Sequence, residues 1–157
     1  MRDSRRFAAT FLLSLVALAA GTVCAPATAS KPEASFPARE GKSLLVFECG
    51  DEKAVWLRVW HPVRGWRPDL ASEVQIGPKV FRTEVDGATD SFLLSDVPLP
   101  GMGVTDALLS AAKDGSELVL AGPAARQIPG PRRSFPLKDA RARISRVERA
   151  CGHAITP

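Results

Sequence analysis

The sequence predicts an α+β fold: an antiparallel β-sheet of about five strands, with a short helix and a C-terminal helix packed on the sheet. Short apolar runs rich in Val, Leu, Phe and Trp alternate with breaks containing Gly and Pro, which is typical of strands and turns. Near the C-terminus the apolar residues recur with the period of a helix. One cysteine lies in the first run and another in that helix, which favours a link between sheet and helix.

The composition sets broad limits on the kind of protein. The chain has 157 residues, 45% of them hydrophobic and 24% charged, with a formal net charge of +4. This length suits one domain, or one domain with a processed segment, and the apolar content is sufficient for a core. The composition therefore argues against wholesale disorder. The sequence does not specify a biochemical activity, and we expect no cofactor.

Residues 1–29 have the pattern of a signal peptide. Arginines within residues 2–6 precede an uncharged, apolar stretch over residues 7–20, which is too short to span a bilayer that needs ~20 helical residues. Residues 27–29 (ATA) match the A-x-A cleavage pattern, and a cut near Ala25 is also open. We therefore expect a periplasmic or secreted protein.

A flexible leader and then a hairpin are expected to open the processed chain. Residues 30–41 are polar, carry Pro and show no periodicity, so we expect them to form the leader. Residues 42–157 then make up a single α+β domain. Within it, residues 43–49 (SLLVFEC) and 54–61 (AVWLRVWH) are apolar runs joined by about four residues that include Gly, which predicts a β-hairpin.

Further strands and one short helix are expected after the hairpin. Breaks rich in Pro and Gly predict loops at residues 61–70 and 122–131. Runs bounded by such signals predict strands at residues 73–76, 80–85, 91–95 and 116–121. Asp86 and Gly87 predict a turn before the strand at 91–95. Residues 105–113 (TDALLSAAK) predict a short helix with Thr105 as its N-cap.

The clearest helical pattern covers residues 137–151. Its apolar members recur at steps of three and four residues and share one stripe: Leu137, Ala140, Ile144, Val147 and Cys151. Pro136 precedes this segment, and Gly152 is placed to end it. An amphipathic helix of this kind is expected to dock its stripe on the sheet.

Cys49 and Cys151 are expected to form a disulfide. Cys24 would be removed with the signal peptide, and Val23 stands where lipidation of Cys24 requires a small residue. Cys49 shares its strand face with the apolar side chains of its own run, and Cys151 lies on the helix stripe. A bond closing about 100 residues contributes about 4–5 kcal/mol in the chain-entropy model. Two alternatives remain open, namely two separate buried thiols, or a metal site that adds the two histidines.

The order of these features resembles that of a group of small exported proteobacterial domains. A strand ends in cysteine (LLVFEC), a second follows (VWLRVW), and later come ELVLAG, the residues Phe135, Pro136 and Leu137, and a helix that closes in Cys-Gly-His. This pattern is similar to type VI secretion-associated VasI-like domains and, less closely, to invasion-associated locus B-like domains. The resemblance implies a β-rich domain tied by a Cys–Cys bridge and no assigned catalytic site. His153 stands where these domains usually carry an aromatic residue.

The sequence favours a non-enzyme. It has no Gly-x-Ser-x-Gly elbow, no phosphate-binding Gly loop and no dinucleotide fingerprint. The nearest pairs of acids, at residues 51–52 and at Glu84 and Asp86, fall at predicted turns, where acids are common. The alternative is a small envelope hydrolase in which His61 acts with a nearby carboxylate.

An aromatic and basic stretch is the first candidate binding surface. Trp56, Arg58 and Trp60 share one face of a predicted strand, and more Trp and Arg follow in the loop. Because Trp and Arg are frequent in binding hot spots, we predict a binding patch made of Trp60, Arg64, Trp66 and Arg67. In the alternative interpretation Trp56 and Trp60 fill a second apolar layer beneath loops.

A basic segment is the second candidate surface. Basic side chains outnumber acidic ones over residues 126–149, and the predicted patch consists of Arg132, Arg133, Arg141 and Arg146. Such a patch attracts an anionic partner, although arginines on a helix also simply occupy its solvated face. We expect a non-catalytic exported module that binds a protein or an anionic envelope component and no nucleic acid. A stapled scaffold that presents the Pro-rich loops is a structural alternative.

Overall fold

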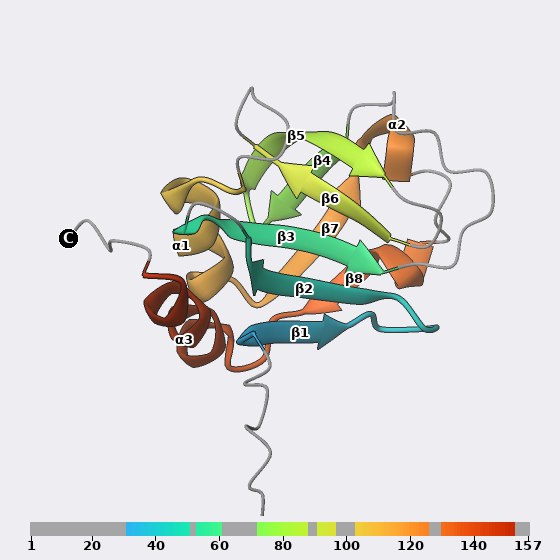
Figure 1. The fold of residues 1–157 in the computed structure, drawn as a ribbon. Helices are drawn as coiled ribbons and strands as arrows, with labels where there is room; N and C mark the ends of the chain where they lie inside the picture. The colour runs from blue at the N-terminus through green and yellow to red at the C-terminus, as the bar shows by residue number, and fades with distance from the viewer. Residues whose placement is uncertain are drawn as a thin grey trace, which may run out of the picture.

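The computed structural model describes residues 31–50, 53–60, 72–87, 91–96, 103–125 and 130–152, which form eight strands and two main helices (Figure 1). The strands are β1 (Glu33–Pro37), β2 (Leu44–Cys49), β3 (Val55–Trp60), β4 (Ser72–Ile76), β5 (Lys79–Gly87), β6 (Ser91–Ser95), β7 (Glu117–Ala121) and β8 (Ser134–Pro136). The helices are α1 (Asp106–Asp114) and α3 (Ala140–Cys151), with two single turns, α2 (Gly122–Ala125) and the 3-10 turn η2 (Gly130–Arg133).

All eight strands belong to one antiparallel sheet that curls almost into a barrel (Figure 1). The strand order is β1-β2-β3-β6-β5-β4-β7-β8. Strand β5 lies at the corner, because its first half pairs with β4 and its second half, from Glu84 onward, pairs with β6. The curl brings the two end strands together, and the backbone N–H of Arg39, just after β1, donates to the carbonyl of Ser134 on β8 at 2.9 Å.

The α+β class is confirmed, but the expected number of about five strands is too low. The largest error concerns the predicted flexible leader, because residues 33–37 form strand β1. Ala34 and Phe36 alternate with polar residues and are fully buried, so this polar segment contributes two side chains to the core. Strand β8 was also missed, because it has three residues and inserts Phe135 alone.

The core lies inside the curled sheet and is closed at one end by α1 and α3, which lie side by side (Figure 1). Strand alternation sends one side chain in two inward. Phe36 and Phe47 meet edge to face with ring centroids 6.0 Å apart. The largest fully buried side chains are Phe36, Leu45, Phe47, Leu57, Leu94, Leu108, Leu109, Leu118, Leu120, Phe135 and Ile144.

The predicted hairpin is confirmed, and one predicted turn is wrong. Strands β2 and β3 pair from Cys49 opposite Val55 outward, as the two apolar runs indicated. Asp86 and Gly87, predicted as a turn, instead extend β5 and pair with Leu93 and with the residue before it on β6. The ladder hydrogen bonds and the buried face of β6 outweigh the local turn preference of an Asp-Gly pair.

Helix α1 begins with a side-chain cap, and helix α3 ends at a glycine. Thr105 is the N-cap of α1, as predicted, and its hydroxyl accepts a hydrogen bond from the N–H of Leu108. Helix α3 starts at Ala140, three residues later than expected, because Asp139 adopts a left-handed conformation at the N-cap. Gly152 ends it with a φ of 66°, a conformation that glycine adopts without strain.

The predicted disulfide is confirmed. Cys49 at the end of β2 and Cys151 at the end of α3 are bonded across a sequence separation of 102, with their Cα atoms 5.4 Å apart. The helix stripe faces the core, since Ile144 and Val147 are fully buried. A second link joins the helices, where the Lys113 Nζ of α1 lies 2.8 Å from an oxygen of the buried Glu148 of α3. Helix α3 is therefore held by packing, by a covalent bond and by an ion pair.

None of the helices in the described part of the chain has the length and apolar character needed to cross a membrane.

Candidate functional site

The outer face of strands β3, β6 and β5 gathers aromatic, acidic and small polar side chains. Alternation on β3 sends Val55, Leu57 and Val59 into the core and leaves Trp56, Arg58 and Trp60 on the outer face: the first three are fully buried and the last three are not. The strand register then sets the neighbours of these three residues. Arg58 lies opposite Leu93 of β6, which lies opposite Asp86 of β5, and Trp60 lies opposite Ser91.

Arg58 organises the β3 end of this face. Its Nε donates to the Glu48 carboxylate at 2.7 Å, and its Nη1 lies 3.4 Å from the Ser91 hydroxyl. The two charged side chains are 22% and 23% exposed, so this ion pair is partly shielded from water. The guanidinium carbon also lies 5.5 Å from the ring centroid of Trp60, whose side chain stands 41% exposed. Trp60 is therefore a large apolar side chain that is exposed to solvent and contacts Arg58, whose position is fixed by its ion pair.

Two glycines, Gly50 and Gly103, lie close to the ring of Trp56. A Cβ added to Gly50 would lie 2.1 Å from the indole ring, and one added to Gly103 would lie 3.2 Å from it. Both glycines thus let backbone approach the ring. The indole Nε1 is buried and makes no hydrogen bond within the described residues. Packing, rather than a hydrogen bond, sets the orientation of this ring.

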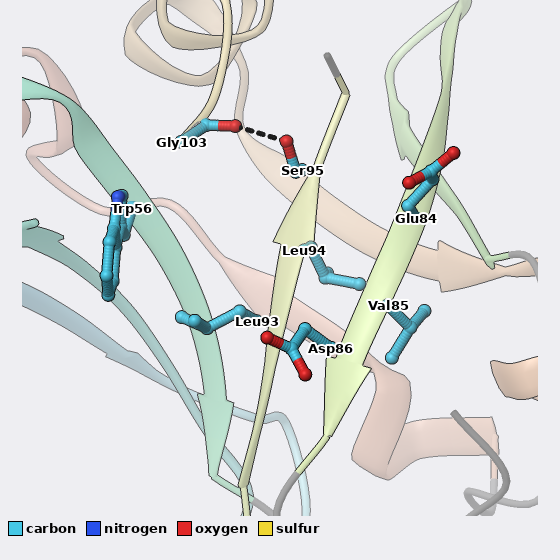
Figure 2. Close-up of a pocket in the computed structure, with 8 residues that line it drawn as sticks. All are labelled: Trp56, Glu84, Val85, Asp86, Leu93, Leu94, Ser95 and Gly103. Atoms are coloured by element: carbon cyan, nitrogen blue, oxygen red, sulfur yellow. Dashed lines mark hydrogen bonds between the residues drawn. The ribbon is translucent and has the colours of Figure 1, made fainter. Parts of the chain in front are cut away.

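A small hollow of about 40 Å³ lies beside Trp56 over strand β6 (Figure 2). It is lined by Trp56, Glu84, Val85, Asp86, Leu93, Leu94, Ser95 and Gly103. The hollow exists because Ser95 is the short side chain between the indole and Glu84, and its hydroxyl is bound to the Gly103 carbonyl at 2.7 Å (Figure 2). Both carboxylates on the β5 side are exposed.

A second hollow, of about 300 Å³, lies on the β1 and β2 side of the same ring. It is lined by Lys31, Glu33, Glu48, Cys49, Gly50, Trp56 and Arg58. Trp56 therefore separates two depressions on one sheet face. We call this face, made of Arg58, Trp56, Trp60, Leu93 and the β5 carboxylates, the outer aromatic face.

Only one member of the predicted aromatic patch can be placed on this face. Trp60 lies at the end of β3, exposed as the binding interpretation requires. Arg64, Trp66 and Arg67 lie outside the described residues, and so does His61 of the hydrolase alternative. Leu93 and Ser95 were not among the predicted site residues, and Glu84 was predicted to lie at a turn. The alternation of outward side chains in E-V-D and in S-F-L-L-S is the signal that indicates these residues.

The structure does not gather the predicted basic patch into one cluster of free cations. Arg141 is exposed and forms an ion pair with Asp114 at the end of α1, while Arg146 is exposed on α3. Arg133 is half-buried in η2, and its Nε has no hydrogen-bond partner in the described ranges. The side chain of Arg132 lies outside what the structure describes. Part of the positive charge is therefore already neutralised within the fold.

A separate ion pair joins the two ends of the curled sheet. The Arg39 Nε lies 2.5 Å from Glu117 on β7 and 3.1 Å from the Ser134 hydroxyl on β8. These two contacts of Glu117, first with Arg39 and then with Ser134, hold the pKa of that carboxyl below its usual value. Because Arg39 is 58% exposed, water screens much of the attraction. This pair closes the sheet and does not form a site.

The described residues hold no group of three or more His, Cys, Asp or Glu side chains suited to a metal ion. They also contain no histidine, so the carboxylates of the outer aromatic face stand without an imidazole neighbour in this part of the chain. The arrangement places an aromatic ring, an arginine and acids on one face of the sheet, and Trp and Arg are side chains that are frequent in binding hot spots.

No protein-family model matches the chain, and neither a curated protein nor a solved structure is significantly similar to it. The class of protein is therefore defined by its own architecture. It is a nearly closed, eight-stranded antiparallel sheet with two helices at one end and a disulfide that ties the last helix to the sheet.

Proposed function

We propose that this protein is a non-catalytic, exported module that binds a partner protein through its outer aromatic face. The observation that carries the proposal is Trp60, 41% exposed and backed by Arg58 at 5.5 Å. Burying an exposed tryptophan removes a large apolar area from water, and Trp and Arg are among the side chains that most often dominate binding energy. The backbone of Trp60 is paired with Leu44 of β2 and with Ser91 of β6, so its position is fixed before binding, which lowers the entropy lost on binding.

The disulfide supports export. Disulfides form and persist in the periplasm or outside the cell and are rare in the reducing cytosol. The bond between Cys49 and Cys151 and the signal-peptide pattern of residues 1–29 both support an exported protein, located in the periplasm or in the secreted fraction. The similarity to VasI-like and invasion-associated locus B-like domains would make it an accessory to secretion or to host interaction.

A protein partner fits this face better than an anionic envelope component. Glu33, Glu84 and Asp86 are exposed on or beside the outer aromatic face and repel anionic lipid. The basic groups that would attract such lipid lie on α3 and η2, where Asp114 already neutralises Arg141. The predicted basic patch is thus separate from the outer aromatic face, where Arg58 is paired with Glu48.

The test is affinity capture from an envelope extract with three versions of the protein. Trp60→Ala removes the exposed ring and is expected to abolish capture of the partner. Val80→Ala is the matched control, because Val80 is 56% exposed but lies on the half of β5 that pairs with β4. Thermal melts establish that both variants are folded. Equal capture by all three proteins contradicts the proposal.

Export is tested separately, by measuring the mass of the mature N-terminus in cell fractions. A chain that begins within residues 26–30 in the periplasm or medium supports the proposal, and an intact Met1 there contradicts it.

A further inference from the structure

We propose that the hollow over strand β6 binds an arginine side chain of the partner protein. This inference rests on the proposed function, because it names the chemistry that the outer aromatic face recognises. The carboxylates of Glu84 and Asp86 would accept hydrogen bonds from the guanidinium, and the Trp56 ring and Leu93 would contact its plane and its methylene groups.

Among the described residues, the carboxylates of Glu84 and Asp86 form no ion pair with their neighbours on this face. Glu84 and Asp86 are two residues apart on β5, so both project outward on the same side. Both are exposed, and neither joins an ion pair within the described ranges. Figure 2 shows both on β5, with the carboxylate of Asp86 beside Leu93. A cation that binds here meets two negative charges without displacing an existing partner.

Neither Arg58 nor Arg82, the arginines that flank this surface on β3 and β5, lines the hollow. Arg58 is held by Glu48 at 2.7 Å on the far side of Leu93. Arg82, two residues before Glu84, lies opposite Glu73 of β4. The local charge of the hollow therefore stays negative, and it would repel phosphate and carboxylate ligands.

The opposite wall of the hollow is aromatic and fixed. The Trp56 ring is held between Gly50 and Gly103, so it presents one orientation to the space over Ser95 (Figure 2). An arginine guanidinium is planar and weakly hydrated, stacks on an indole, and pairs with a carboxylate through two parallel N–H groups. A lysine ammonium is a compact, strongly hydrated charge that gains less from such a wall. The hollow is small, at about 40 Å³, which suits the tip of a single side chain.

The binding test uses a blocked tripeptide, acetyl-Gly-Arg-Gly-amide, added to the purified, disulfide-intact protein at low salt. Binding is followed by NMR through the indole N–H signal of Trp56, assigned with Trp56→Phe, and through the methyl signals of Leu93. We expect a saturable shift of both signals, and none with the same peptide carrying citrulline, which keeps the shape and loses the charge. Each of Glu84→Gln and Asp86→Asn is expected to weaken the peptide about tenfold, the loss of one hydrogen bond to a charged group.

The matched control is Glu40→Gln, which removes an exposed carboxylate from the segment after β1, outside the lining of the hollow, and is expected to leave peptide affinity unchanged. Equal binding of the citrulline peptide, an equal effect of Glu40→Gln, or no saturable shift overturns the proposal. Partner capture that depends on Trp60 but not on Glu84 or Asp86 also overturns it and leaves the proposed function standing. If Trp60→Ala captures the partner as well as the unchanged protein does, while the arginine peptide still binds, the proposed function is contradicted and the arginine site still stands.

Discussion

The guanidinium carbon of Arg143 lies 4.4 Å from the ring centroid of Phe36, so an arginine of α3 covers an aromatic core residue of β1. The same guanidinium donates to the backbone carbonyl of Ser35. Strand β1 is one end of the sheet, and an unpaired strand edge invites pairing with another chain. Arg143 therefore has two roles: it packs the helix on the sheet and satisfies part of that edge.

Replacing Arg143 by Ala is expected to lower the free energy of unfolding by about 1–3 kcal/mol, because it removes the ring contact and a charged hydrogen bond. The loss is measured by urea denaturation. Arg146→Ala is the control from the exposed face of the same helix, with an expected effect within about 0.5 kcal/mol. Equal losses from both variants would show that Arg143 acts only as a general helix residue.

Replacing Cys49 and Cys151 together by Ser is expected to lower the free energy of unfolding by about 2–5 kcal/mol. The cause is the added conformational freedom of an unfolded chain that is no longer closed over a separation of 102 residues. Urea denaturation should give the same free energy of unfolding for this variant and for the protein whose disulfide has been reduced. Identical midpoints for oxidised and reduced protein would contradict the prediction.

Replacing Lys113 by Met is expected to cost about 2–4 kcal/mol, because the buried Glu148 carboxylate loses its counter-ion. The double variant with Glu148→Leu is expected to recover most of this loss, since two apolar side chains of similar size then fill the space. A double-mutant cycle from denaturation midpoints measures the coupling. Additive losses would show that the two charges do not interact.

Replacing Gly50 by Ala is expected to displace the Trp56 ring, because the new Cβ would lie 2.1 Å from it. The expected loss of stability is about 1–3 kcal/mol, typical of overpacking. A changed indole N–H signal of Trp56 reports the displacement. Adding Trp56→Phe to Gly50→Ala should recover part of the lost stability. If the stability losses of the two single variants simply add in the double variant, contact between the new Cβ and the ring is not the cause.

Acid should weaken the closure of the sheet at Glu117. Arg39 and Ser134 lower the pKa of this carboxyl in the folded state. The ionised carboxylate therefore contributes fully to the free energy of unfolding above the unfolded pKa of about 4.3, and this contribution is lost as the pH falls through the folded pKa. Thermal melts of the protein and of Glu117→Gln should therefore differ more at about pH 6 than at about pH 3. A difference that grows as the pH falls would reverse the sign of this linkage.

Local patterns predicted the elements whose signals repeat within the element itself. The alternation along β2 and β3 indicated the hairpin, and the stripe from Leu137 to Cys151 indicated α3 and its docked face. The same two patterns placed Cys49 and Cys151 toward one core, which is why the disulfide could be predicted. Each of these inferences needs only the period of a strand or of a helix.

The tertiary structure alone decided the ends of the sheet, the bend of β5 and the outer aromatic face. Strand β8 has three residues, too few for a periodic signal, and β1 has only two apolar side chains within a polar stretch that carries Pro, so both strands depend on their ladder partners and the core. Asp86 extends β5 because Leu93 lies opposite it, and the ring of Trp56 is approached by Gly50 from its own hairpin and by Gly103 from far along the chain. The sequence by itself determined which side chains turn inward along each long element. Which outward side chains become neighbours depends on strand order and register, and those are set by contacts between residues far apart in the chain.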